Sequence, residues 1–318
     1  MNILYFFPRA LYEHKMSPGR VQYGEAVARQ PGVDLKVWGP GWDGWDDTLT
    51  VAANCGKQFG AGWLDTLWSY KASDHQPGAG TGWRRSIVCF NEANDQSKTM
   101  PDIKSSAATD VIFHHENDWR LWAPLLTAAG VRSHRLMHCV DPNYFRVVDR
   151  PESIAMRPIP SIVSGVQAPR IYPLRARFAK FIDEGRFPGR VRKHPGYRLF
   201  DLKSCQSQYR DYTRQLSLSH VSLCCTSKHR YALAKIIESL AAGCVTVTDF
   251  PEDGRWIRDL GQFCVRVADT ETDESLISYV ANAIEKGQYV DRAAAGQKWV
   301  LENLTTDHYA RDFLACLQ

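Results

Sequence analysis

The stretch KHRYALAKIIESLAAGCVTVTDFPED, residues 228–253, decides the fold class of this chain. It follows an apolar run, residues 221–225, which reads as a buried strand and ends in a Thr-Ser pair suited to cap a helix. We expect the helix to begin near the start of the stretch, to end at Gly243 and to lead into a second buried strand, residues 245–248. A strand, a helix and a parallel strand in succession form the β-α-β unit of an open α/β sheet.

The predicted helix has one apolar and one polar face. The apolar face carries Leu233, Ile236, Ile237 and Leu240, and the opposite face carries Tyr231, Lys235 and Glu238 at i, i+4 and i+7. Open α/β sheets bind ligands beyond the carboxyl ends of their strands, where a helix N-terminus offers free N–H groups and partial positive charge. We expect that position to be occupied by Lys228, His229 and Arg230.

The length of the chain, 318 residues, and its apolar content predict two domains of similar size. Composition shifts to Pro, Arg and Asp over residues 146–160, which places the boundary near residue 150. We therefore predict an α/β protein with two Rossmann-like domains facing a cleft, residues 1–150 and 151–318. The last helix, near residues 308–317, could pack back on the first domain.

Positive charge is concentrated in one segment. Residues 1–150 carry equal numbers of basic and acidic side chains, whereas residues 157–230 hold fifteen Lys or Arg against four Asp or Glu. Such a block favours a polyanionic partner, most simply a pyrophosphate, and otherwise a nucleic acid backbone or an acidic membrane surface. The alternative is a solvated basic face without a partner.

Nine cysteines are scattered along the chain, and several fall inside predicted strands. This distribution is typical of reduced core residues rather than of a disulfide framework. No CxxC pair is present, so we expect no zinc site. No run approaches the roughly 20 apolar residues of a membrane span, and the start of the chain lacks a basic leader. We therefore expect a cytoplasmic protein without a transmembrane segment.

The first half reads as the β-loop-α-β opening of a doubly wound sheet, although the GxGxxG fingerprint is absent. Its predicted strands are residues 2–7, 33–38, 87–90 and 111–113, its predicted helices are residues 21–29 and 119–129, and a short helix is expected near residues 63–70. A polar cluster follows the strand at 111–113 and contains His115, Glu116 and Asp118. Polar side chains at strand ends belong to the ligand-binding edge of such a sheet.

Four segments of the second half resemble the GT-B glycosyltransferases, specifically their group 1, family 4-like branch. The main match is AKIIESLAAGCVTVTDFPED, residues 234–253, followed by AAAGQKWVLENLTTDHYARDFLACL, residues 293–317. HCVDPNYF at 138–145 and SGVQAPRIYPLRARF at 164–178 are also similar. These matches cover most of residues 138–318, whereas the first half matches only in its element order.

The resemblance implies roles for individual residues. Glu238 matches the glutamate that holds the donor ribose hydroxyls, and Arg170 and Arg175 match basic positions near the donor phosphates. Arg230 stands where the family often has a second glutamate, which favours a phosphate contact there. As an alternative, Lys235 and Glu238 form only a surface ion pair. With the local pattern and the His194-Pro-Gly-Tyr turn, the predicted donor site comprises Arg170, Arg175, His194, Tyr197, Lys228, Arg230, Tyr231, Lys235 and Glu238.

The resemblance also implies the chemistry. His115 looks like the histidine that lines the donor-acceptor cleft, and an inverting reaction would take its base from His115, Glu116 or Asp118, whereas a retaining reaction needs none. His115 reads equally well as a hydrogen-bonded structural residue. Arginines, a lysine and a helix N-terminus can neutralise a departing diphosphate, and no DxD motif is present, so we expect no metal and no cofactor.

Three functions fit this pattern. The first is a glycosyltransferase that moves a sugar from a nucleoside-diphosphate sugar, UDP- or GDP-linked, to a glycan, lipid-linked or small-molecule acceptor. The second is the same chemistry on a modified base in phage DNA, which would require base flipping and strong salt dependence. The third is a sugar-nucleotide binder that is not a transferase, such as an epimerase of the same architecture.

Overall fold

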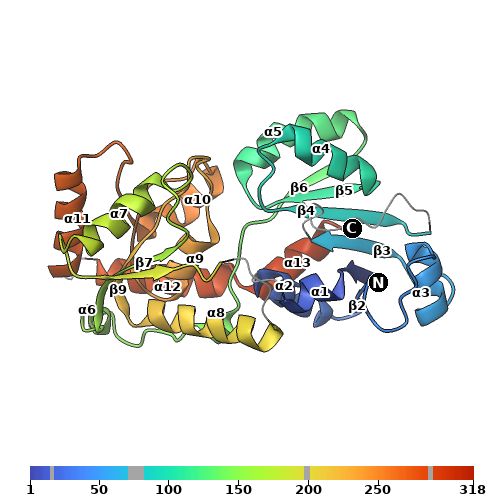
Figure 1. The fold of residues 1–318 in the computed structure, drawn as a ribbon, viewed down its shortest axis with the longest axis horizontal. Coiled ribbons are helices and arrows are strands. Elements are labelled where there is room, and N and C mark those ends of the chain that lie inside the picture. Colours follow the sequence, from blue (N-terminus) through green and yellow to red (C-terminus); the bar gives the residue numbers. More distant parts are fainter. Residues whose placement is uncertain (15–17, 71–81, 197–200, 286–288) are drawn as a thin grey trace. The chain divides into compact units, whose positions relative to one another are not determined.

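The computed structural model describes residues 1–14, 18–70, 82–196, 201–285 and 289–318 (Figure 1). The chain forms two compact units. The first contains Met1–Met137, Tyr197–Gln206 and Thr306–Gln318, and the second contains His138–Gly196 and Ser207–Thr305. The units thus divide after Met137, whereas the composition shift predicted a boundary near residue 150.

The first unit is built on a six-stranded sheet in which all pairings are parallel. Its strand order is β2-β1-β3-β4-β5-β6. The strands are β1 (Asn2–Phe6), β2 (Asp34–Trp38), β3 (Thr66–Tyr70), β4 (Arg85–Phe90), β5 (Asp110–Phe113) and β6 (Arg132–Arg135). The helices are α1 (Arg9–His14), α2 (Pro18–Ala28), α3 (Val51–Phe59), α4 (Gln96–Ser105), α5 (Glu116–Ala128) and α13 (Thr306–Ala315).

The predicted short helix near residues 63–70 is wrong, because residues 66–70 form strand β3 in the middle of the sheet. Leu67, Trp68 and Ser69 are all buried, so this strand lacks the alternation that would have marked it. Trp68 stacks on Tyr5 of the neighbouring β1 with ring centroids 4.0 Å apart. Packing on both faces of the sheet therefore overrides the weak local pattern.

Helix α13 closes the first unit. Tyr309 stacks on Tyr23 of α2 with ring centroids 4.2 Å apart, and Phe313 packs on Trp68 at 4.4 Å. Arg85 of β4 donates a hydrogen bond to the carbonyl of Cys316, 3.2 Å away. The last helix thus supplies core side chains to the sheet formed by the first part of the chain.

The second unit has a five-stranded parallel sheet of order β11-β10-β9-β7-β8. Its strands are β7 (Ile159–Gly165), β8 (Arg190–Lys193), β9 (Ser219–Leu223), β10 (Val245–Thr248) and β11 (Cys264–Arg266). Its helices are α6 (Glu152–Ala155), α7 (Pro173–Asp183), α9 (Ala234–Ala241), α10 (Gly254–Asp259), α11 (Asp273–Glu285) and α12 (Val290–Asn303), with short 3₁₀ turns at Pro142–Tyr144 and Gly261–Phe263. Helix α8 (Leu202–Ser217) begins among residues of the first unit and continues into the second.

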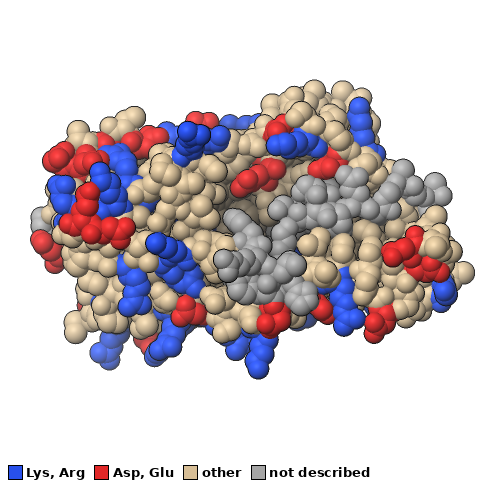
Figure 2. Space-filling model, in the orientation of Figure 1, with Lys and Arg blue, Asp and Glu red and all other residues tan. Residues whose placement is uncertain are grey.

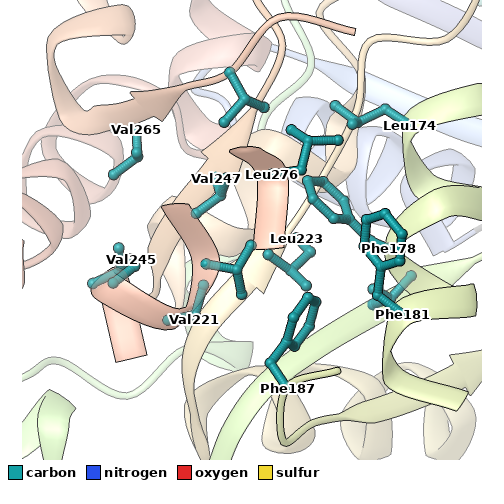
Figure 3. Packing of buried hydrophobic residues seen from close by; sticks show 14 of the residues in the cluster. Leu174, Phe178, Phe181, Phe187, Val221, Leu223, Val245, Val247, Val265 and Leu276 are labelled. Carbon is teal, nitrogen blue, oxygen red and sulfur yellow. The ribbon is translucent and has the colours of Figure 1, made fainter. Parts of the chain in front are cut away.

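The core of the second unit lies between α7, α11 and the sheet (Figure 3). Leu174, Phe178 and Phe181 share one face of α7 because they are spaced by three or four residues. They pack against the buried valines and leucines of the sheet, Val221, Leu223, Val245 and Val247. The inner strands β7, β9 and β10 are buried on both faces, as expected for a parallel sheet covered by helices, whereas the edge strand β8 is not.

All nine cysteines lie within the described residues and are free thiols. Across those residues, the longest and most apolar helices still fall short of what a membrane crossing needs.

Candidate functional site

The carboxyl ends of β7 and β9 bring together two cations of the second unit. Gly165, the last residue of β7, has a φ of 106°, a value that side chains rarely tolerate. A Cβ at this position would lie 2.8 Å from Cε of Lys235 and 3.0 Å from Nη1 of Arg175. Glycine therefore leaves room for both side chains to meet at the end of the strand.

Arg175 is held in place yet retains an unused donor. Its side chain is buried, its Nη1 donates to the Val166 carbonyl at 3.1 Å, and its guanidinium lies 4.2 Å from the centre of the Tyr172 ring. Among the described residues, its buried Nε has no hydrogen-bond partner, and neither do Ser164 Oγ and Gln167 Nε2 of the same turn. Buried polar atoms are almost always paired, so this group is suited to an anionic or polar ligand.

Lys235 enters the same site from the first turn of α9. Its ammonium lies 4.2 Å from the centre of the Tyr212 ring and 3.9 Å from Oε2 of Glu238. Burial lowers the pKa of Lys235, and the charge of Arg175 adds to that effect, whereas Glu238 opposes it. One carboxylate does not balance the cations gathered here, so an added anion would relieve their mutual repulsion.

Glu238 is fixed by two tyrosines of α8. Tyr212 donates its hydroxyl to Oε2 at 2.8 Å, and Tyr209 donates to Oε1 at 3.2 Å. Burial, followed by the charge of Glu238, raises the pKa of both tyrosines well above its usual value, so both remain donors. Glu238 and Lys235 thus form the ion pair expected as an alternative, but within a packed cluster rather than on an open surface.

Tyr209 and Tyr212 were not predicted from the sequence, and Arg192, one of several arginines near the predicted phosphate positions, lies with them. Arg192 places its guanidinium 5.3 Å from the Tyr212 ring centre and donates to Asp211 at 3.2 Å. The two tyrosines are three residues apart, so in a helix such as α8 both lie on one face, and this spacing is the local signal for a pair of hydroxyl groups. Nothing in the local sequence connects that face to Glu238.

The predicted start of the helix at Lys228 is wrong, because α9 begins at Ala234 with Leu233 as its N-cap. Ser227 and Arg230 have φ values of 68° and 56°, which interrupt helical geometry. Asp249 fixes this turn by accepting from the backbone N–H and the hydroxyl of Thr226, at 2.8 and 2.7 Å. The predicted cap Thr226–Ser227 therefore belongs to a separate turn before the helix.

Arg230 and Tyr231, two predicted donor-site residues in this turn, are engaged in contacts that were not expected. Arg230 lies 3.2 Å from Asp249 and 3.6 Å from Asp269, so two carboxylates offset its charge. Burial raises the pKa of Asp249, and the hydrogen bonds from Thr226 act against that rise. Tyr231 is buried and stacks on His229 outside the helix, and hence does not share a helix face with Lys235.

The remaining predicted donor residues lie at the edge of the site or outside it. His194 accepts a hydrogen bond from the Gly196 N–H at 3.0 Å, and burial, with the charges of Lys235 and Arg192, lowers its pKa. Arg170 and Lys228 are exposed. Tyr197 lies outside the described residues. The structure thus brings together Arg175, Lys235, Glu238 and His194 of the predicted set.

The basic block is partly offset by acidic neighbours. Arg177 donates to Asp273, which lies outside the block, at 2.6 Å. Arg192 lies 3.2 Å from Asp211, which belongs to the block itself. On the face drawn in Figure 2, Lys and Arg side chains are interspersed with Asp and Glu. Arg177 and Arg192 are therefore offset by carboxylates, whereas Arg170, Arg186 and Lys228 of the block are exposed.

The acceptor-side residues predicted in the first unit follow β5 as expected. His115 is the N-cap residue of α5 and is buried. Glu116 forms ion pairs with Arg120 and Arg135, and Asp118 accepts from the Ala93 N–H at 2.8 Å. The carboxylates of Glu116 and Asp118 are thus engaged in contacts within the protein. The catalytic role of His115, Glu116 and Asp118 stays a prediction.

Comparison with solved structures covers the whole chain. Sucrose-phosphate synthase from Thermosynechococcus elongatus superposes with a TM-score of 0.63 at 10% sequence identity, covering 100% of this chain and 98% of the other. HepE from Anabaena, solved in complex with UDP and glucose, gives 0.60 at 11% identity, with 100% and 99% covered. This chain has the GT-B fold.

A glycosyltransferase from Rickettsia africae gives a TM-score of 0.56 at 12% identity, with 99% of this chain and 97% of the other covered. No family model matches the sequence, and no curated protein matches it. The predicted architecture of two Rossmann-like halves is therefore confirmed at the level of the fold. At such low sequence identity, the reaction has to be inferred from the residues of the site.

Proposed function

We propose that this protein is a glycosyltransferase that takes its sugar from a nucleoside-diphosphate sugar bound at the carboxyl edge of the second sheet. The observation that carries the proposal is the meeting of Arg175 and Lys235 at Gly165, with buried donors left unused in the same turn. A diphosphate supplies the negative charge and the acceptor oxygens that this cluster lacks.

Glu238 would hold the ribose of the donor. Its carboxylate already accepts from Tyr209 and Tyr212, which fix its orientation and leave lone pairs for the two hydroxyls of a diol. Lys235 lies between this carboxylate and Arg175 along the same edge. The order ribose, diphosphate, sugar then runs from Glu238 toward Gly165 and beyond.

In the proposed reaction, the bond between the anomeric carbon and the diphosphate oxygen breaks, and the electron pair leaves with the diphosphate. An acceptor hydroxyl oxygen forms the new bond, and its proton passes to a base or to the departing diphosphate. Arg175 and Lys235 stabilise the growing negative charge, because they are preorganised in a largely desolvated site. His115, Glu116 and Asp118 remain the proposed residues on the acceptor side.

UDP is the donor nucleotide that we favour, because the HepE structures include complexes with UDP and with UDP-glucose. Removing the ribose contact in the Glu238→Ala variant should raise the dissociation constant for UDP roughly 10- to 100-fold, the effect of losing hydrogen bonds to a charged group. Titration calorimetry with UDP, GDP and their glucose conjugates measures both the base preference and the loss.

Glu184→Ala is the matched control, since Glu184 is an exposed glutamate at the end of α7. Its affinity for UDP should equal that of the unmodified protein. Equal UDP affinity of Glu238→Ala and the control would reject the donor site. Release of free UDP from a UDP-sugar only when acceptor is added separates a transferase from an epimerase.

A further inference from the structure

Two open pockets adjoin each other in the second unit, away from the donor site. The arginine pocket, of about 480 Å³, is lined by Arg146, Arg150 and Arg157 together with Asp149. The α12 pocket, of about 560 Å³, is lined mainly by Val147, Val148, Pro151, Ala294, Ala295 and Leu301. Val147 and Val148 line both, so a charged pocket and an apolar one lie side by side.

The arginine pocket has an excess of positive charge. Arg146 and Arg150 are exposed, and within the described part of the chain neither forms an ion pair. Arg157 is held by carbonyl groups, with Nη1 donating to Ser219 at 2.9 Å and Nη2 to Ala242 at 3.0 Å. Three guanidinium groups against the single carboxylate of Asp149 make this pocket suited to a phosphate or carboxylate group.

The α12 pocket is apolar at its centre and polar at its rim. Val147 is 61% exposed, which is unusual for a valine in a fixed segment. The rim carries Asp291, Lys298 and Glu302, of which the last two pair at 3.9 Å. An apolar pocket of this size with a few polar groups around it is typical of small-molecule sites.

The segment between the pockets is fixed by a buried side chain of α12. Gln297 is 2% exposed, accepts from the Val148 N–H at 2.7 Å and donates to the Arg146 carbonyl at 2.9 Å. A third bond, to the Ala241 carbonyl at 2.8 Å, ties this glutamine to α9. The valines that line both pockets are thus held in place before any ligand binds, which reduces the entropy lost on binding.

The pockets lie at the opposite edge of the sheet from the donor site. Arg157 bonds to Ser219, the first residue of β9, and to Gly243 before β10, whereas Gly165 is the last residue of β7. The five residues of β9 correspond to about 13 Å of strand length. A ligand in these pockets would therefore leave the donor site open.

We propose that these two pockets form one binding site for an amphiphile with an anionic head group, such as an alkyl phosphate or a phosphorylated lipid. The head group contacts Arg146 and Arg150, and the apolar chain lies over Val147 and along α12 against Leu301. The juxtaposition of a cationic and an apolar pocket at a fixed segment selects this class over a free anion or a neutral lipid.

The test is calorimetry of the full chain with decyl phosphate below its micelle concentration. We expect one saturable site whose affinity falls at least tenfold in the double variant Arg146→Gln/Arg150→Gln. It should fall as much in Ala295→Trp, which fills the α12 pocket from an exposed helix position without touching the core. Saturating UDP should leave the affinity unchanged.

The matched control is Arg186→Gln/Arg258→Gln, which removes the same charge from exposed positions outside both pockets. Equal loss in this control, or no saturable binding, would overturn the proposal. If inorganic phosphate binds as tightly as decyl phosphate, the site is a plain anion site and the proposal is wrong. If decanol binds as tightly, the site is a purely apolar one and the proposal is also wrong. None of these outcomes depends on Glu238, so the donor-site proposal is tested separately.

Discussion

At the scale of single residues, the donor site depends on how Glu238 is oriented. Its two carboxylate oxygens each accept from a different tyrosine, and both tyrosines come from α8. A carboxylate held in this way is preorganised for a diol. The hydroxyl groups of Tyr209 and Tyr212 therefore act on the ligand through Glu238 and are positioning residues.

The variant Tyr212→Phe should weaken UDP binding roughly tenfold, because the loss of one hydrogen bond to a charged group costs about 1.5 kcal/mol or more. The apolar ring of phenylalanine still packs beneath Lys235, so the fold should persist. Calorimetry with UDP measures the effect. Tyr279→Phe is the control, because Tyr279 is 42% exposed on α11. An unchanged affinity in Tyr212→Phe would contradict the positioning role.

At the scale of an element, the turn from β7 to α7 shapes the site. Gly165 permits the backbone conformation and the close approach of Lys235, while α7 carries Arg175 on its first turn. Among the described residues, Ser164 at the end of β7 and Gln167 just after it have buried polar atoms without a hydrogen-bond partner. Replacing this glycine therefore tests the conformation and the space together.

Gly165→Ala should abolish measurable UDP binding and lower the free energy of unfolding by about 1–3 kcal/mol, the cost of a side chain in this backbone region. The displaced groups would be Lys235 and Arg175. Gly185→Ala separates the two effects, because Gly185 has a φ of 70° with nothing within 4 Å of its added Cβ. The control should lose stability without losing UDP affinity. Normal UDP binding by both variants would show that the space at Gly165 does not control the donor site.

At the scale of the whole molecule, the two units have different electrostatic designs. The second gathers cations around the single carboxylate of Glu238, whereas the first pairs its buried Asp110 with Arg132 and His134. Hydrogen bonds from His134 and Arg132 outweigh the burial of Asp110 and lower the pKa of that carboxyl. The bond to Asp110, with one to Cys316 of the C-terminal segment, raises the pKa of His134 to about 9.

The stability of the first unit should therefore depend on pH in two opposite ways. His134 stabilises the fold fully below pH 6.5, and this contribution is lost as the pH rises through about 9. Burial lowers the pKa of His114 to about 4, so the unfolded chain binds the extra proton and stability falls between pH 6.5 and 4. Urea midpoints from pH 4 to 9.5 should peak near 6.5.

Two variants test which histidine causes the fall in stability on each side of the maximum. His134→Gln should flatten the alkaline limb and leave the acid limb, and His114→Gln should flatten the acid limb. A profile in which each variant shifts the whole curve without changing its slopes would contradict the assignment.

Much of the architecture followed from local patterns. The strand at residues 245–248, the glycine stop at Gly243 and the apolar face of α9 were predicted because periodicity and stop signals act over a few residues. Strand β3 and the start of α9 were not, because packing on both faces of a sheet and the turn held by Asp249 depend on distant segments. The same holds for Tyr209 and Tyr212, which reach Glu238 from 26 or more residues away.

By itself, the sequence determined the two-part α/β architecture, the β-α-β unit that ends at residues 245–248 and the choice of Arg175, Lys235 and Glu238 as site residues. Only the tertiary structure decided which of these side chains meet. It also showed that Arg230 forms ion pairs with two carboxylates and that two pockets share Val147 in their linings. The reason is physical: hydrophobic periodicity and caps are local properties of the chain. Charge pairing, burial and the space around a glycine depend on residues that only folding brings together.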